Sequence, residues 1–474
     1  MIDFPQSTNV FKYFYDLTQI PRGSGNTKAV SDYLVAFAKR NNLWYHQDSE
    51  NNVIIKKSAS KGYESYAPVI IQGHIDMVCE KESDCEINFL TDALQIETDN
   101  EFIFAKGTTL GADDGIAVAY ALAILESNDI PHPPLEVVLT SDEETGMDGA
   151  MALDSSLLES KTLLNIDTEQ EGIFTVSCAG GINVIGELDV NFKEETSNGY
   201  EITICGLMGG HSGVEIHKKR ANANIIAGRL LNELSNVKLS SINGGLKHNA
   251  IPAECKLVIA CECDLDKQIS DFKETVKEEY KSSDRDLKIV FSKFSNKNIR
   301  VTSHEDAKNI ASLLSSMPDG VFSMSEDIDG LVKTSSNLGI LETRENGLYF
   351  LSSVRSSEEK EKTSYSDIIL NHIIAHKGTA KKGEEYPAWE YLQESPLRTV
   401  MCKVYEEMYQ KPPITEAIHA GLECGIFCGK IKGLDCVSFG PDIFDIHTPK
   451  ERLSISSAQR TWEFLKKVLE NLKI

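Results

Sequence analysis

The sequence lacks the features of a secreted or membrane-spanning protein. It contains no C-x-x-C pair, and its eleven cysteines are scattered along 474 residues. This usage is typical of reduced thiols in a cytosol rather than of a disulfide framework. The N-terminal segment has no basic start followed by an apolar run, so we expect no signal peptide. No stretch of about 18 apolar residues occurs, so we expect no transmembrane helix. These absences predict a cytoplasmic protein.

Positive charge is also scarce. The chain has 48 Lys and Arg against 72 Asp and Glu, a formal net charge of −24. Such a surface repels phosphate backbones and anionic lipids, so we expect neither nucleic acid nor a membrane as a partner. Most of the acidity is explained by solubility, and part of it can be carboxylates gathered around metal ions.

Several catalytic signatures are missing as well. The absence of HExxH excludes a zincin, and no G-x-S-x-G nucleophile motif or thiol-protease signature occurs. No G-K-[ST] follows the glycines of GTTLGADDG, so a phosphate-binding loop is not expected.

The organisation of the chain favours two domains. Residues 1–183 alternate helical and strand patterns, which predicts a layered α/β fold with a parallel sheet. Near SCAGG (177–181) the composition changes, and residues 184–378 are typical of an inserted α+β domain. We interpret HKGTAKKGEE (376–385) as a linker, after which residues 379–474 return to the first domain.

Histidines and carboxylates follow several predicted strands. His74 ends the strand of IQGHIDMV, and Asp76 stands two residues on, where a carboxylate can fix the tautomer of a ligating histidine. Asp167 follows the strand of LLNIDTEQEG, and His447 follows that of VSFGPDIFDIHTPKE. Ligands of open α/β sheets bind beyond the carboxyl ends of the strands, so these side chains are expected to meet. Alone, H-x-D is more typical of an ordinary strand-end histidine.

Two acidic clusters add oxygen ligands. Asp113 and Asp114 begin a predicted helix, where capping alone would explain them. Asp142, Glu143 and Glu144 follow the strand LEVVLT, where they are either solvated or hold a cation and a general base. The combination of these nitrogen and oxygen donors, rather than any single motif, indicates a site for zinc, with manganese or cobalt as alternatives.

The ordered set of motifs resembles a known family, the aminoacyl-histidine dipeptidases or cytosol non-specific dipeptidases. These are di-zinc peptidases related to carnosinases, tripeptide aminopeptidases and acetylornithine deacetylase. The resemblance covers nearly the whole chain, and it rests on IPRGSGN, GHIDMVCEK, GTTLGADDGIAVA, TSDEETGMDGA, NIDTEQEG, GLMGGHSGVEIHKKRANAN, SINGGLKHNAIPAE, VRSS, IHAGLECGIF and the region around His447.

The resemblance implies a di-zinc exopeptidase-like fold, with a three-layer α/β catalytic domain (1–183 and 379–474) and an inserted α+β lid or dimerisation domain (184–378). It implies two zinc ions per subunit, which manganese or cobalt can replace. Asp113 would bridge the two ions and precede a cis peptide bond. His74 and Asp167 would complete one metal site, and Glu144 and His447 the other.

The resemblance also implies the catalytic roles. Asp76 would orient His74, and Glu143 would be the general base that activates a zinc-bridging hydroxide. Many relatives carry D-x-K-G at the bridging aspartate, whereas this chain has Gly115 in place of the lysine, as the dipeptidase branch does.

Four residues would contact the substrate. His211 in GGHSG matches a lid histidine that stabilises the oxyanion, although a Gly-rich turn is the simpler interpretation. Arg355 in VRSS would clamp the substrate carboxylate, a task suited to a planar cation, with a surface salt bridge as the alternative. Asn249 and Gly421 would line the pocket.

The sequence therefore predicts a dipeptidase acting on unblocked dipeptides, including Xaa-His. The alternatives are a tripeptidase or an N-acyl amino-acid deacylase on the same metal site, or a non-enzymatic peptide- or metal-binding protein. In many relatives the lid contacts a second subunit, so we expect a homodimer. A lid that folds back onto its own active site is the other arrangement.

Overall fold

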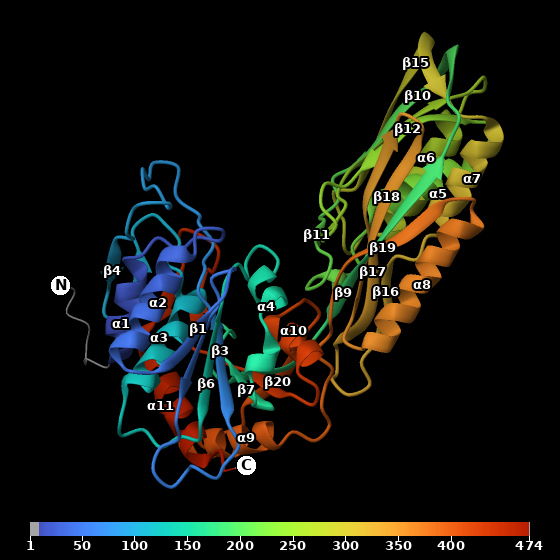
Figure 1. Ribbon diagram of the computed structural model, residues 1–474. Coiled ribbons are helices and arrows are strands. Elements are labelled where there is room, and N and C mark those ends of the chain that lie inside the picture. Colours follow the sequence, from blue (N-terminus) through green and yellow to red (C-terminus); the bar gives the residue numbers. More distant parts are fainter. Residues whose placement is uncertain (1–8, 474) are drawn as a thin grey trace. The chain divides into compact units, whose positions relative to one another are not determined.

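The computed structural model describes residues 9–473 and divides the chain into two units (Figure 1). Unit 1 comprises Met1–Ser177, Tyr391–Ala417 and Leu422–Ile474. Unit 2 comprises Cys178–Glu390 and Ile418–Gly421.

The centre of unit 1 is an eight-stranded sheet of order β1-β2-β6-β3-β7-β21-β8-β20. Its strands are β1 Trp44–Gln47, β2 Val53–Lys57, β3 Val69–His74, β6 Leu135–Thr140, β7 Thr162–Asn165, β8 Ile173–Cys178, β20 Ile414–Ile418 and β21 Asp435–Ser438. The strands β6, β3, β7 and β21 run parallel, and β3 and β6 are buried at every position. Continuous apolar runs of this kind form strands that are covered on both faces.

The prediction of a parallel sheet was wrong for the strands outside this centre. β1 pairs antiparallel with β2, β2 with β6, and β21 with β8. The short turn between β1 and β2 is the reason for the first of these pairs, since a connection of a few residues can only join antiparallel neighbours.

Helices cover both faces of this sheet: α1 and α3 lie together on one side, and α4 and α10 on the other (Figure 1). The helices of unit 1 are α1 Asn9–Thr18, α2 Lys28–Arg40, α3 Ala112–Glu126, α4 Asp148–Ala152, α9 Pro396–Tyr409, α10 Glu423–Lys430 and α11 Ile455–Asn471, with the short helix η1 Ser155–Leu157. A small sheet joins β4 Ile96–Thr98, β5 Phe102–Ala105, β22 Ile443–Phe444 and β23 Arg452–Ser454.

Unit 2 is built on a nine-stranded antiparallel sheet whose main path runs β15-β10-β14-β12-β17-β18-β9-β19, with β16 paired to β17. Its strands are β9 Gly180–Asp189, β10 Lys193–Cys205, β12 Lys238–Gly244, β14 Cys255–Ala260, β15 Lys288–Val301, β16 Gly320–Met324, β17 Val332–Arg344, β18 Gly347–Ser356 and β19 Thr379–Tyr386. The helices are α5 Ala223–Glu233, α6 Asp266–Glu279, α7 His304–Ser315 and α8 Glu359–Ala375, with η2 Ile216–Lys218. Their apolar residues share one buried core with the sheet. A separate pair joins β11 Gly210–His211 to β13 Ala250–Ile251.

The segment 376–385, interpreted as a linker, is mostly a strand. β19 pairs along β9 from Thr379 to Tyr386 at the end of the sheet. Its lysines and glutamates gave it a loop-like composition, but charged residues are typical of edge strands, where they discourage pairing with other chains. Residues 178–183 and 379–390, which we expected in the first domain, group with unit 2. The strands β9 and β19 at these two ends both belong to the sheet of unit 2.

None of the helices within residues 9–473 is both long enough and apolar enough to cross a membrane. Within the same residues, no two cysteines form a disulfide.

Candidate active site

One carboxylate lies between two histidines at the carboxyl edge of the unit 1 sheet. His74 ends β3, and its Nε2 is 3.0 Å from Asp113 Oδ1. His447 comes from the loop before β23, and its Nε2 is 3.2 Å from Asp113 Oδ2. The two oxygens of Asp113 thus face different imidazoles. The peptide bond between Asp113 and Asp114 is cis.

Two further carboxylates complete this cluster. Asp167 follows β7, and its Oδ1 is 3.7 Å from His74 Nε2. Glu144 follows β6, and its Oε1 is 3.0 Å from His447 Nε2. Donor atoms of His74, Asp113 and Glu144 lie within 4.8 Å of one another, as do those of His74, Asp114 and Asp167. Three parallel strands and one distant loop thus converge on a set of nitrogen and oxygen donors of the kind that binds divalent metal ions.

Asp76 connects these donors to one another. Its Oδ1 is 3.3 Å from His74 Nδ1 and accepts the backbone N–H of Glu143 at 3.1 Å. Its Oδ2 accepts from the hydroxyl of Ser24 at 2.7 Å and from the backbone N–H of Glu144 at 3.4 Å. Asp76 is fully buried. It therefore holds the ligating histidine and the acidic loop after β6 in one arrangement.

The electrostatics of the cluster favour a bound cation. Hydrogen bonds to Asp113 and Glu144 raise the pKa of His447 to about 10. Burial would lower the pKa of His74, but Asp113 and Asp76 outweigh it and raise that pKa well above its usual value. Burial would raise the pKa of Asp113, but His447 and His74 hold it below its usual range. The carboxylates raise the pKa of both imidazoles because the cluster has an excess of negative charge. Divalent ions bound here would neutralise that charge.

Glu143 is half-buried beside this cluster. Burial raises its pKa to about 8, and the neighbouring carboxylates of Glu423 and Glu144 add to the effect. Glu423, which begins α10, had no predicted role. It is fully buried, and its Oε2 accepts from Gln72 at 2.5 Å and from Thr140 at 2.8 Å. Only the apolar setting of HAGLECGIF could have indicated this position in the sequence.

The four predicted substrate-binding residues all lie in unit 2, whereas the predicted metal ligands, Asp76 and Glu143 all lie in unit 1. His211 ends β11, and its Nδ1 accepts the backbone N–H groups of Gly213 and Val214 at 3.2 and 3.1 Å. Burial and the charge of Arg355 lower the pKa of His211. A neutral imidazole that accepts at Nδ1 carries its proton on Nε2, which is therefore a hydrogen-bond donor.

Arg355 is a buried cation without a carboxylate partner. It lies in β18 with 8% of its surface exposed. Its Nη1 donates to the Tyr386 hydroxyl at 2.6 Å, and its Nε has no hydrogen-bond partner. No carboxylate within residues 9–473 lies at ion-pair distance from it, so the structure does not favour the salt-bridge alternative. A buried charge without a partner is costly. A bound anion would compensate the charge of Arg355. Tyr386 was missed because its segment resembled a linker.

Asn249 and Gly421 lie near the GGHSG turn. The carbonyl of Asn249 accepts from Ser212 N–H at 2.9 Å. The segment that ends at Gly421 packs against the same turn, since a Cβ on Gly213 would lie 2.4 Å from the carbonyl oxygen of His419. His419, another residue without a predicted role, is bonded through Nε2 to the Ser335 hydroxyl at 2.7 Å.

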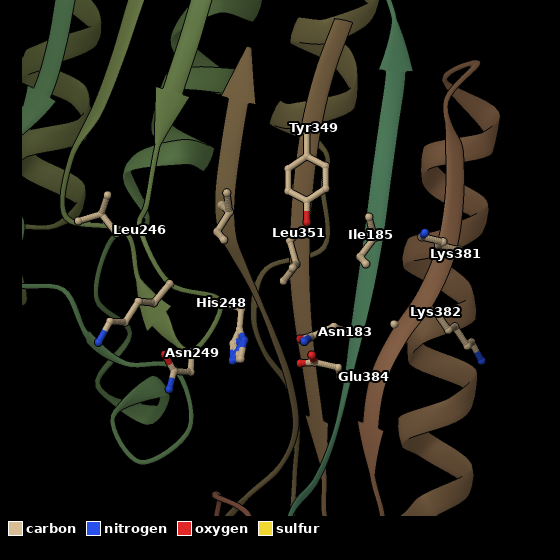
Figure 2. Close-up of a pocket in the computed structure, with 13 residues that line it drawn as sticks. Asn183, Ile185, Leu246, His248, Asn249, Tyr349, Leu351, Lys381, Lys382 and Glu384 are labelled. Atoms are coloured by element: carbon tan, nitrogen blue, oxygen red, sulfur yellow. The ribbon is translucent and has the colours of Figure 1, made fainter. Parts of the chain in front are cut away.

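A cavity of about 730 Å³ lies on the sheet of unit 2, beside Asn249 (Figure 2). Its floor includes Tyr349 and Leu351 of β18, and Lys381 and Lys382 of β19 form part of its wall. Of the four predicted substrate-binding residues, Asn249 alone contributes to this lining as the structure describes it.

The donor set is that of a site for divalent metal ions, and comparison with known proteins gives the family. The model of peptidase family M20/M25/M40 matches residues 70–471. The chain belongs to this peptidase family. The predicted fold class, an α/β catalytic domain with an inserted α+β domain, is confirmed by this match and by the solved relative described next.

Two relatives match almost the whole chain. The cytosol non-specific dipeptidase of Escherichia coli (strain K12) is 35% identical over 97% of this chain and 96% of its own. The crystal structure of aminoacylhistidine dipeptidase from Vibrio alginolyticus has 34% identity and a TM-score of 0.90, covering 98% of this chain and 96% of that one. A tripeptidase from Staphylococcus aureus has the same fold at 16% identity, with a TM-score of 0.58 and 98% of each chain covered. The resemblance to aminoacyl-histidine dipeptidases is thereby confirmed.

Proposed function

We propose that this protein is a metal-dependent dipeptidase that hydrolyses unblocked dipeptides, including those with C-terminal histidine. The names of the two relatives that match nearly end to end support the substrate class. The single observation that carries the proposal is the carboxylate of Asp113, whose two oxygens lie against His74 and His447.

Two zinc ions are the proposed cofactors, with manganese or cobalt able to replace them. His74 and Asp167 would hold one ion, Glu144 and His447 the other, and Asp113 both. The support is chemical: a carboxylate that faces two imidazoles can share its charge between two cations. Asp114 is left out of the proposed set, although it lies close enough to His74 and Asp167 to share an ion with them; its Oδ2 accepts the backbone N–H of His74 at 3.2 Å.

When bound, the ions would supply a Lewis acid and an activated water. Glu143 would accept a proton from water on its carboxylate and pass it to the amine nitrogen of the leaving group. Asp76 acts through its neighbours, since it fixes His74 and the backbone N–H of Glu143.

Unit 2 would supply the contacts to the ends of the dipeptide. Arg355 binds the terminal carboxylate with the guanidinium nitrogens that have no anion partner. His211 donates its Nε2–H to the oxygen of the scissile carbonyl, where negative charge develops. Asn249 and the backbone of Gly421 line the rest of the pocket. These contacts act within one subunit or across a homodimer.

A homodimer and a cytosolic location remain part of the proposal. The support for the location is the name of the Escherichia coli relative, which is a cytosol dipeptidase, and the thiol chemistry of the cysteines.

A small substrate panel tests the proposed function. We expect hydrolysis of alanyl-histidine, β-alanyl-histidine or alanyl-alanine, and loss of that hydrolysis with a chelator. Trialanine and N-acetyl-histidine serve as controls. Cleavage mainly of trialanine or of the acetylated compound would move the assignment to a tripeptidase or a deacylase. No cleavage by metal-replete protein would indicate a binding protein.

A further inference from the structure

Beneath the site, the loop that carries Asp113 is bound by a single buried carboxylate. Glu451 Oε2 accepts the backbone N–H groups of Leu110 and Gly111 at 2.8 and 3.0 Å. Its Oε1 accepts those of Ala112 and Asp113 at 2.7 and 3.4 Å. Only 2% of Glu451 is exposed. The backbone N–H groups at the start of a helix have no partner within it and favour an anion, and here a side chain of the protein fills that place for α3.

A buried arginine binds the same loop through a backbone carbonyl. Arg22 is 2% exposed. Its Nη1 donates to the carbonyls of Ile75 and Asp76 at 3.0 and 2.9 Å, and its Nη2 donates to the carbonyl of Gly111. Arg22 therefore joins two parts of the site. One is the segment that directly follows His74 at the end of β3, and the other is the loop that carries Asp113. It comes from the IPRGSGN motif, to which the proposed mechanism gives no task.

The space that Arg22 occupies depends on Gly115. A Cβ at Gly115 would lie 2.5 Å from Arg22 Nη2, closer than side chains pack. Many relatives have lysine in D-x-K-G where this chain has Gly115. Because glycine has no side chain, this position leaves room for the guanidinium of Arg22.

Glu451 also lies four residues after His447, in the same loop. Its own backbone N–H donates to the Thr448 carbonyl at 3.1 Å. One residue therefore connects the loop of His447 to the backbone of Asp113, whose carboxylate lies 3.2 Å from the His447 imidazole.

We propose that Arg22 and Glu451 form a buried positioning frame that sets Asp113 relative to His74 and His447, and that this frame determines the affinity of the site for its metal ions. The proposal rests on the proposed function, because it takes Asp113 as the shared ligand. Residues that orient metal ligands commonly contribute a factor of about 10 to 100 to metal affinity. Ligand positions must be held to within about 0.5 Å, which a loop secured at four N–H groups can achieve.

Two variants test the frame, and a third serves as their control, each by calorimetric titration of metal-free protein with Zn²⁺. Glu451→Gln keeps the shape but removes the charge that binds four N–H groups, and we expect at least one of the two ions to bind about 10- to 100-fold more weakly. Gly115→Ala leaves both charges and displaces Arg22, so the same loss is expected. Alanine is favoured over glycine within a helix, so a merely structural role at this position predicts no such loss.

Glu136→Gln is the matched control. Glu136 is also a buried carboxylate, 3% exposed, and it accepts the backbone N–H groups of Glu159 and Ser160. It stands near the start of β6, whereas the metal ligands follow the ends of the strands. We expect its replacement to change the unfolding temperature without changing Zn²⁺ affinity.

The outcomes separate the frame from the proposed function. Wild-type protein that binds fewer than two ions contradicts the metal site itself. Wild-type binding of two ions with unchanged affinity in Glu451→Gln and Gly115→Ala overturns the frame alone, and so does an equal loss of affinity in Glu136→Gln. If Glu451→Gln does not fold, the affinity of Gly115→Ala decides.

Discussion

Replacing Glu143 by glutamine is expected to lower kcat on alanyl-histidine by about 10²- to 10⁴-fold, the range that a positioned general base contributes, while both metal ions stay bound. The loop would keep its shape, because Asp76 holds Glu143 by its backbone N–H and not by its side chain. Glutamine has the same size but cannot accept a proton from water. Turnover rate and metal content, measured on the same preparation, test this expectation.

Glu144→Gln is the matched control for Glu143→Gln. The two residues are neighbours in one loop, but Glu144 Oε1 lies 3.0 Å from His447 Nε2, and we propose it as a metal ligand. We expect its replacement to lower metal content and activity together. Loss of metal from Glu143→Gln, or full metal content in Glu144→Gln, would contradict this division of roles.

The strand pattern of the sequence located much of the site. His74 and Asp167 follow short apolar runs that become buried parallel strands. The carboxyl ends of such strands share one edge of the sheet, so sequence alone predicted that these side chains meet. The strand before His447 also predicted that this histidine would reach the same edge, but only the resemblance paired it with Glu144 as a ligand of one metal ion.

The residues that hold the ligands in place could not be predicted in the same way. Glu451 and Arg22 act on backbone groups of loops far away in the sequence, and neither belongs to a periodic pattern. Tyr386 was missed because β19 is an edge strand, whose lysines and glutamates resemble the composition of a loop. Its partner Arg355 was predicted to bind the substrate carboxylate, with a surface salt bridge as the alternative, and the structure has no carboxylate of the described residues at ion-pair distance from it.

Replacing Arg355 by alanine is expected to lower kcat/KM for unblocked dipeptides by about 30-fold or more, because truncating one side of a buried charge pair costs roughly 2 kcal/mol or more. Most of the change should be in KM, since the substrate carboxylate is present in both the ground state and the transition state. The same dipeptides with an amidated C-terminus should lose little, because they have no carboxylate for the guanidinium to bind.

Two further variants serve as controls for Arg355→Ala. Tyr386→Phe keeps the Arg355 cation and removes only the hydroxyl that lies 2.6 Å from Nη1, so we expect a smaller rise in KM. Lys381→Ala removes an exposed cation from β19, which lies two strands from β18 in the same sheet. This variant should leave kcat/KM unchanged if the loss in Arg355→Ala does not arise from net charge alone. An equal loss on free and amidated dipeptides in Arg355→Ala would mean that the arginine supports the fold of β18. A loss confined to the free acids would identify it as the residue that selects substrates with a free C-terminus.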